Sequence, residues 1–363
     1  RNYKEAIKTQ LKIVEQNPSK QNYFGESGDI DGDYAVAVGI HSENPIAWNG
    51  GIVNVYKQND KGVWELTRGM YPKTSSSKDR FGQDACAMSG KYVIVGDWMN
   101  ATQEFGAAHI FKFWGDTAWE EVAYLAPKTT IDVKSFGKSV AIYENYAVVG
   151  ADKSAYIFEL QTDSSWKQVK KITKTNAEGF GNNVAIHNDY IIVSAEWEDI
   201  DGIESAGAVY VYYNDEKLGW KYLQKIKLSS ENIKTKSDFG SSIDIYKNNI
   251  LIGYPNAKMG EISAGNAYLY EKNGAKFELK QKLYTEGFKF NKYRFGEKVS
   301  ISENYIAIGE AQGVDHRGSV YLFEKTANEF KEVSRFTTGK SAYYGNDFGQ
   351  NGLSVSNNNL FIG

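Results

Sequence analysis

Several short stretches of the chain carry side chains whose types and spacing suit the binding of a cation or a partner. Five acidic residues fall within nine positions, namely Glu196, Glu198, Asp199, Asp201 and Glu204. Closely spaced carboxylates repel one another, and their oxygens are the ligands that hard cations prefer. The stretch would therefore accept a cation or a basic partner, and a merely solvated acidic loop is the alternative.

A second acidic motif, Asp29-Ile30-Asp31-Gly32-Asp33, has the alternating carboxylates of a calcium loop. The later carboxylates that would complete such a loop are absent, because Ala35, Val36 and Ala37 follow. A solvated turn is the competing interpretation, and the sequence indicates no cofactor other than Ca²⁺. The candidate metal ligands are Asp29, Asp31, Asp33, Glu196, Glu198, Asp199 and Asp201.

Aromatic residues form a third set of candidates. Trp48, Trp98 and Trp197 fall in corresponding loops of an internal repeat, and Tyr254 opens another such loop. Tryptophan buries much area at little entropic cost, so these four are candidate partner-binding residues. Packing of each tryptophan on a neighbouring repeat is the alternative. Asn100-Ala-Thr102 is the one usable glycosylation triplet, with Asn100 as the acceptor.

The internal repeat is a Phe-Gly pair that recurs on average every 54 residues. Two short apolar runs about a polar turn follow each pair, which is typical of a β-hairpin. A third run follows a small residue, and a lysine-rich fourth run opens with an aromatic such as Trp166 or Trp220. This pattern predicts blades of four antiparallel strands. They open at Phe24, Phe81, Phe136, Phe180, Phe239, Phe295 and Phe348.

We therefore expect an all-β fold, a seven-bladed β-propeller of four-stranded antiparallel blades forming a single domain over residues 1–363. The last repeat, from Phe348 to Gly363, has room for only two strands. Residues 1–16 have the pattern of a fourth strand, with Tyr3 at the aromatic position. We predict that this N-terminal strand pairs into blade seven and closes the ring, an amphipathic helix being the alternative. The native chain is expected to extend beyond both ends.

The seven Phe-Gly pairs, with a glycine in the second run of most repeats such as Gly150 and Gly309, resemble the FG-GAP repeat. The resemblance covers the whole chain, although the trailing proline is absent and Ser194 replaces one glycine. It implies the seven-bladed fold of integrin α head domains and related microbial surface proteins. Members of that family usually act in adhesion or partner recognition outside the cell.

Composition excludes several classes of function. The chain of 363 residues carries a formal charge of −3, so it lacks the basic field that nucleic acid requires. No apolar run approaches the length of a membrane helix, so we expect no membrane insertion. Cys86 is the single cysteine and has no partner for an intrachain disulfide.

Catalytic motifs are missing, and the four histidines lack ligand spacing. We therefore expect no enzymatic activity. The leading expectation is a non-catalytic recognition or adhesion module, extracellular or at the cell surface, that binds a protein or glycan through inter-strand loops on one face. A structural scaffold subunit of a larger complex is the alternative. A propeller enzyme with catalytic groups around its central channel is a second alternative.

Overall fold

A computed structural model describes Ile13 and residues 23–363, except 43, 49, 75–78, 80, 84, 101–104, 116–117, 230–237, 260–261, 286–293, 312–317, 338–347 and 357. The chain forms two compact units, an N-terminal unit over Ile7–Thr173 and a C-terminal unit over Lys174–Ile362. The single domain over residues 1–363 stays a prediction. In the described parts of the chain, no helix has the length and apolarity needed to cross a membrane.

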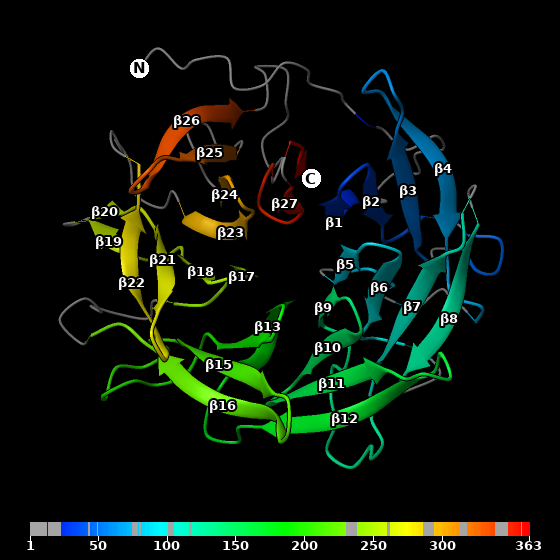
Figure 1. Ribbon diagram of the computed structural model, residues 1–363, viewed down its shortest axis with the longest axis horizontal. Helices are drawn as coiled ribbons and strands as arrows, with labels where there is room; N and C mark the ends of the chain where they lie inside the picture. The colour runs from blue at the N-terminus through cyan, green and yellow to red at the C-terminus, as the bar shows by residue number, and fades with distance from the viewer. Residues whose placement is uncertain are drawn as a thin grey trace. The chain divides into compact units, whose positions relative to one another are not determined.

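The N-terminal unit contains three four-stranded antiparallel sheets, in which each strand pairs with its sequence neighbours (Figure 1). Blade 1 comprises β1 (Phe24–Asp31), β2 (Tyr34–Gly39), β3 (Ile52–Gln58) and β4 (Trp64–Met70). Blade 2 comprises β5 (Cys86–Ser89), β6 (Tyr92–Asp97), β7 (Ala107–Phe113) and β8 (Trp119–Leu125). Blade 3 comprises β9 (Ser139–Tyr143), β10 (Tyr146–Ala151), β11 (Ser154–Leu160) and β12 (Trp166–Thr173).

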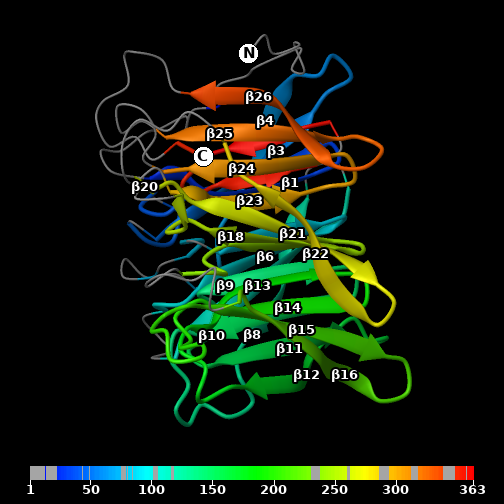
Figure 2. The ribbon, with the colours of Figure 1, turned by 90° about the vertical axis from the view of Figure 1, so that its left-hand side faces the viewer.

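The C-terminal unit contains three more sheets of the same order, seen side-on in Figure 2. Blade 4 comprises β13 (Phe180–His187), β14 (Tyr190–Ala195), β15 (Ala208–Asp215) and β16 (Gly219–Ile226). Blade 5 comprises β17 (Ile243–Tyr246), β18 (Asn249–Tyr254), β21 (Asn266–Asn273) and β22 (Lys276–Leu283), with β19 (Lys258–Met259) and β20 (Ile262–Ser263) in one connection. Blade 6 comprises β23 (Phe295–Ile301), β24 (Tyr305–Glu310), β25 (Ser319–Lys325) and β26 (Phe330–Thr337).

Tight turns explain the hairpins between the first two strands of several blades. Tyr143 pairs with Tyr146 and His187 pairs with Tyr190, so each loop contains two residues. The first loop residue has a positive φ, 49° at both Glu144 and Asn188. Two-residue loops of this conformation match the twist of antiparallel strands and fix their register. The backbone conformation of these two-residue loops thus explains why polar residues recur at the turn in the sequence.

The Phe-Gly repeat joins successive blades. The Phe rings of five repeats, Phe81, Phe136, Phe180, Phe239 and Phe295, are fully buried. The second-strand glycine leaves space for the Phe-Gly backbone of the next blade. A Cβ at Gly96 would lie 1.9 Å from the carbonyl oxygen of Gly137, and one at Gly253 would lie 2.1 Å from that of Gly296. Blades within a unit therefore approach each other at a distance that a larger residue would prevent.

Ser194 of β14 stands where other blades have this glycine. Its hydroxyl is fully buried and accepts hydrogen bonds from the Asn183 backbone N–H, at 3.0 Å, and side-chain amide. The Asn183 amide also donates to the carbonyl of Ser241 in the next blade. The hydroxyl that this departure from the repeat buries therefore has hydrogen-bond partners, as a buried polar group requires.

The expectation of seven four-stranded blades is wrong, because the described chain has six. Phe348 is followed by β27 (Leu353–Val355) and β28 (Leu360–Ile362), which form only a two-stranded sheet. Two strands of three residues offer few ladder hydrogen bonds and little apolar surface. Except for Ile13, the N-terminal strand predicted over residues 1–16 and the ring closure through it lie outside the described residues.

Candidate functional site

Strand pairing in blade 4 brings two loops to the same end of the sheet. Phe180, at the start of β13, pairs with Ala195 at the end of β14, and Ala195 pairs with Ala208 at the start of β15. The segment before β13 and the loop between β14 and β15 therefore leave the sheet together. Both belong to the C-terminal unit.

The loop of residues 196–207 is held by its own hydrogen bonds. Ile200 and Ile203 exchange both backbone hydrogen bonds, at 3.0 and 2.9 Å, around an Asp201-Gly202 turn. Both turn residues have positive φ, 52° and 83°, as such two-residue turns require. The Asp199 carboxylate accepts a hydrogen bond of 2.9 Å from the Ser205 N–H, which ties the two sides of the loop together.

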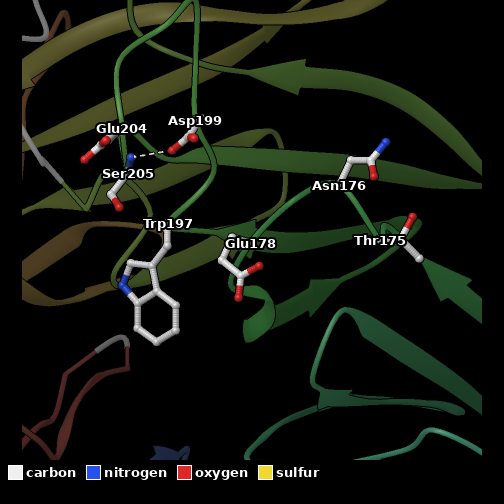
Figure 3. A pocket seen from close by; sticks show the side chains of 7 residues that line it. All are labelled: Thr175, Asn176, Glu178, Trp197, Asp199, Glu204 and Ser205. Atoms are coloured by element: carbon white, nitrogen blue, oxygen red, sulfur yellow. Dashed lines mark hydrogen bonds between the residues drawn. The ribbon is translucent and has the colours of Figure 1, made fainter.

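A pocket of about 410 Å³ lies where this loop meets the segment before β13 (Figure 3). Its volume falls in the range of small-ligand sites. Trp197 supplies its aromatic wall, with 45% of the side chain exposed. The lining residues are Thr175, Asn176, Glu178, Trp197, Asp199, Glu204 and Ser205. Three of the seven lining residues are acidic, and none of the seven is a lysine, arginine or histidine.

Gly179 brings the two walls together. It has a positive φ of 75°, and a Cβ at this position would lie 3.2 Å from the Trp197 backbone nitrogen. Only a residue without a side chain accepts both constraints easily. The segment carrying Glu178 therefore lies directly against the backbone of Trp197.

The acidic stretch predicted from the sequence divides into two parts. Glu198 is buried, and its carboxylate accepts hydrogen bonds from Tyr210 Oη at 3.0 Å and Lys225 Nζ at 2.8 Å. Burial and this carboxylate raise the pKa of Tyr210. Asp201 forms an ion pair of 2.8 Å with Lys227, and Glu196 accepts a hydrogen bond from the Asn182 amide. These three carboxylates have partners within blade 4, and Asp199, which accepts from the Ser205 N–H, lines the pocket together with Glu204.

The Asp29-Ile30-Asp31-Gly32-Asp33 motif has a visible structural role. Asp29 accepts hydrogen bonds from its neighbour's N–H and from the Met88 N–H of blade 2, at 2.8 and 2.7 Å. Asp31 likewise accepts from the Gly90 N–H at 2.7 Å. Within the described ranges, no three His, Cys, Asp or Glu residues are grouped so as to hold a metal ion. Calcium binding at Asp29, Asp31, Asp33 or the later acidic stretch stays a prediction.

The other candidate residues differ in accessibility. Trp48 is 68% exposed and Trp98 is half-buried, both in loops of the N-terminal unit. Tyr254 is only 3% exposed and packs against Phe239 and Tyr268, so its side chain belongs to the core rather than to a binding surface. Asn100 is 4% exposed, and its amide donates to Asp97. An acceptor buried in this way does not present its amide for glycosylation.

Four pocket residues were not predicted from the sequence: Thr175, Asn176, Glu178 and Ser205. Ser205 lies within the loop that carries the acidic stretch, but the other three precede the Phe-Gly pair of blade 4. Antiparallel pairing places the residues before a first strand beside those after the second strand. That rule could have identified the segment, although not which of its side chains line a pocket.

The blades define an all-β protein of the β-propeller class with a loop pocket at one end of blade 4. Residues 166–212 match the family model described as the FG-GAP repeat. The chain therefore carries an FG-GAP repeat, and the resemblance found in the sequence is confirmed there. Among curated proteins, none matches the chain in sequence.

Two of the solved structures that match the chain illustrate the shared fold. A protein from Lactobacillus plantarum is 12% identical, with a TM-score of 0.53 over 84% of this chain and 81% of that one. The periplasmic gluconolactonase PpgL of Pseudomonas aeruginosa is 11% identical, with a TM-score of 0.54 over 85% and 83% of the two chains. At such identities the similarity concerns the fold alone.

The likeness to PpgL overturns the expectation that this chain is not an enzyme. That expectation rested on missing sequence motifs, yet a gluconolactonase is built on a similar fold. Catalytic groups can come from loops far apart in the sequence and leave no short motif. An absence of motifs therefore does not exclude catalysis on this fold.

Proposed function

We propose that the chain is a recognition protein that binds a protein segment or a glycan through the pocket of blade 4. The observation that carries the proposal is the half-exposed indole of Trp197 in a concave site lined by polar side chains. Tryptophan anchors in pockets supply a large part of the binding energy at interfaces. The loop that holds Trp197 is ordered by its own hydrogen bonds, so little entropy is lost on binding.

The test is binding of the fluorescently labelled chain to peptide and glycan arrays, followed by titration of the strongest ligand. We expect Trp197→Ala to weaken binding by about 2 kcal/mol, or roughly thirtyfold. Trp114→Ala is the matched control, because Trp114 is 58% exposed and lies in the other unit. Equal binding by the Trp197→Ala variant and the native chain would contradict the proposal.

Trp48 and Trp98 remain candidate contacts in the corresponding loops of blades 1 and 2. Their alanine variants belong in the same titration, since each removes one indole without altering the blade-4 pocket. A scaffold role would instead leave array binding insensitive to all three tryptophans. An extracellular location stays a prediction.

A second candidate function is hydrolysis of a sugar lactone, which the likeness to a gluconolactonase favours. The pocket gathers three carboxylates, and a carboxylate can act as general base toward water. Release of acid from glucono-1,5-lactone at constant pH measures the reaction. Acceleration that is lost in Glu178→Gln and Glu204→Gln but kept in Glu120→Gln would support this candidate. A rate equal to spontaneous hydrolysis would overturn it.

A further inference from the structure

The hairpin that joins the last two strands of blade 5 has a turn of two residues. Asn273, the last residue of β21, pairs with Lys276, the first residue of β22, which leaves Gly274 and Ala275 in the loop. Gly274 has a positive φ of 58° and takes the first loop position, where a type II′ turn places glycine. The strand pairing therefore puts an Asn-Gly sequence at the tip of this hairpin.

Both residues of this Asn-Gly pair are accessible. Asn273 and Gly274 are exposed, and among the described residues a Cβ at Gly274 would meet nothing within 4 Å apart from its chain neighbours. Gly274 lies between the two strands, so its N–H is not part of the ladder that joins them. The Gly274 nitrogen can therefore approach the Asn273 side chain, and water reaches both residues.

Such a pair supports a spontaneous reaction between side chain and main chain. The Gly274 nitrogen attacks Cγ of Asn273, a carbon–nitrogen bond forms, and the nitrogen gives its proton to solvent. The bond from Cγ to Nδ2 breaks, and Nδ2 takes a proton from water and leaves as ammonia, which closes a succinimide ring. Water then opens the ring at either carbonyl and leaves aspartate or isoaspartate, without oxidation or reduction. Glycine favours the first step because no Cβ crowds its nitrogen.

The leaving amide already has a partner across the hairpin. Asn273 Nδ2 donates a hydrogen bond of 2.8 Å to Oε2 of Glu278, an exposed carboxylate of β22. A hydrogen bond to a carboxylate is charge-assisted and stronger than a neutral one. It restrains the amide in one orientation, and an ionised carboxylate has no proton to give to the departing nitrogen. Ring closure consequently has to break this contact or proceed against it.

We propose that Asn273 is a site of spontaneous deamidation in the folded chain, and that its contact with Glu278 slows the reaction. This site is separate from the pocket of blade 4 and does not depend on its ligand. An isoaspartate at position 273 would lengthen the main chain by one methylene, so the pair with Lys276 would lose its register. The next residue of β22 is Phe277, whose backbone bonds with Gln224 of blade 4. Deamidation would therefore loosen the hairpin beside a contact between blades.

A second Asn-Gly pair, Asn351-Gly352, provides an internal reference. Asn351 is half-buried and Gly352 is buried, just before β27. Close packing restricts both the approach of the glycine nitrogen to Cγ and the entry of water. The fold, rather than the dipeptide, should therefore make Asn273 the faster of the two sites.

The experiment follows both sites while the full chain is incubated in mildly alkaline buffer made with water labelled with heavy oxygen. Peptide mapping by mass spectrometry, with electron-based fragmentation, measures conversion and separates aspartate from isoaspartate. We expect Asn273 to gain one heavy oxygen and to convert at least about tenfold faster than Asn351. In the urea-unfolded chain the two rates should agree within about threefold, because both sites are then open. Equal rates in the folded chain, or no conversion of Asn273, would overturn the proposal.

Three variants test the chemistry of the site. Gly274→Ala should slow conversion of Asn273 by about tenfold, because a Cβ then crowds the attacking nitrogen. Glu278→Ala should accelerate it by about twofold to tenfold, since the hydrogen bond that restrains the amide is lost. Glu271→Ala is the matched control and should keep the native rate, because this exposed carboxylate lies opposite Glu278 but pairs with Lys280 at 3.0 Å. An unchanged rate in Gly274→Ala would overturn the site, and an unchanged or lower rate in Glu278→Ala would overturn the role of Glu278.

Discussion

Two histidines have pKa values that are shifted in opposite directions, because burial lowers both but their charged neighbours differ. His109 of β7 is fully buried, with Nδ1 2.8 Å from Glu121 and Nε2 3.9 Å from Asp97. Burial by itself would lower its pKa, but the two carboxylates outweigh burial and raise the pKa above 6.5. Its stabilising contribution is therefore fully present below about pH 6.5 and is lost as the pH rises through the folded-state pKa.

We predict that His109→Gln destabilises the chain by about 3 kcal/mol at pH 6, because Asp97 and Glu121 lose the buried cation between them. The loss should shrink as the pH rises, since native His109 is then neutral as well. Urea unfolding at a series of pH values measures both effects. A destabilisation independent of pH would show that His109 acts by packing alone.

His187 of β13 should behave in the opposite way. It stacks on Tyr246 at 4.6 Å between ring centres, and burial together with the Lys247 charge lowers its pKa to about 4. Its neutral form is favoured in the folded state, so its contribution is present above pH 6.5 and is lost as the pH falls toward 4. We predict that His187→Phe reduces the loss of stability between pH 6.5 and 4. Parallel pH profiles of variant and native chain would argue against this.

At the scale of elements, the close approach between blades depends on glycine. We predict that Gly253→Ala destabilises the chain by about 3 kcal/mol or more, because its Cβ would lie 2.1 Å from the backbone oxygen of Gly296. Gly69→Ala is the matched control, since the nearest atom there, at 2.4 Å, ends the movable Ile52 side chain. The midpoints of urea unfolding distinguish the two variants. Similar losses would mean that backbone contact is not what restricts Gly253.

A side-chain amide also joins successive blades. Gln224 of β16 donates to the Phe277 carbonyl at 3.0 Å and accepts from the Phe277 N–H at 2.8 Å, and Gln281 does the same with Phe330. We predict that Gln224→Leu costs about 1–3 kcal/mol, because both backbone groups of Phe277 lose a partner. Gln161→Leu, whose amide bonds within its own blade at 3.2 Å, should cost less. Equal losses on thermal unfolding would contradict this account.

At the scale of the whole molecule, the chain has two compact units with cores of their own. The buried cluster that contains Ile94 and Phe136 lies in the N-terminal unit, and the cluster around Phe295 lies in the C-terminal unit. We predict that Ile94→Ala, which costs about 2–5 kcal/mol, accelerates amide exchange over residues 7–173 more than over 174–362. Ile252→Ala should show the reverse. Uniform acceleration in both variants would indicate a single cooperative unit.

The sequence by itself determined the local secondary structure of this protein. The polar turns and the alternating runs depend on interactions between residues near in sequence, so hairpins such as Tyr143–Tyr146 can be predicted from the residues alone. Ser194 could be recognised as a departure from the repeat, although its network with Asn183 could not.

Only the tertiary structure decided what depends on residues distant in sequence. It formed six four-stranded blades from the described residues, paired the Asp29 carboxylate with the Met88 N–H 59 residues away, and buried Tyr254 and Asn100. It also placed Glu178 beside Trp197, although a strand pair separates them in the chain. Side-chain neighbours of this kind arise from packing between elements, which local periodicity does not encode.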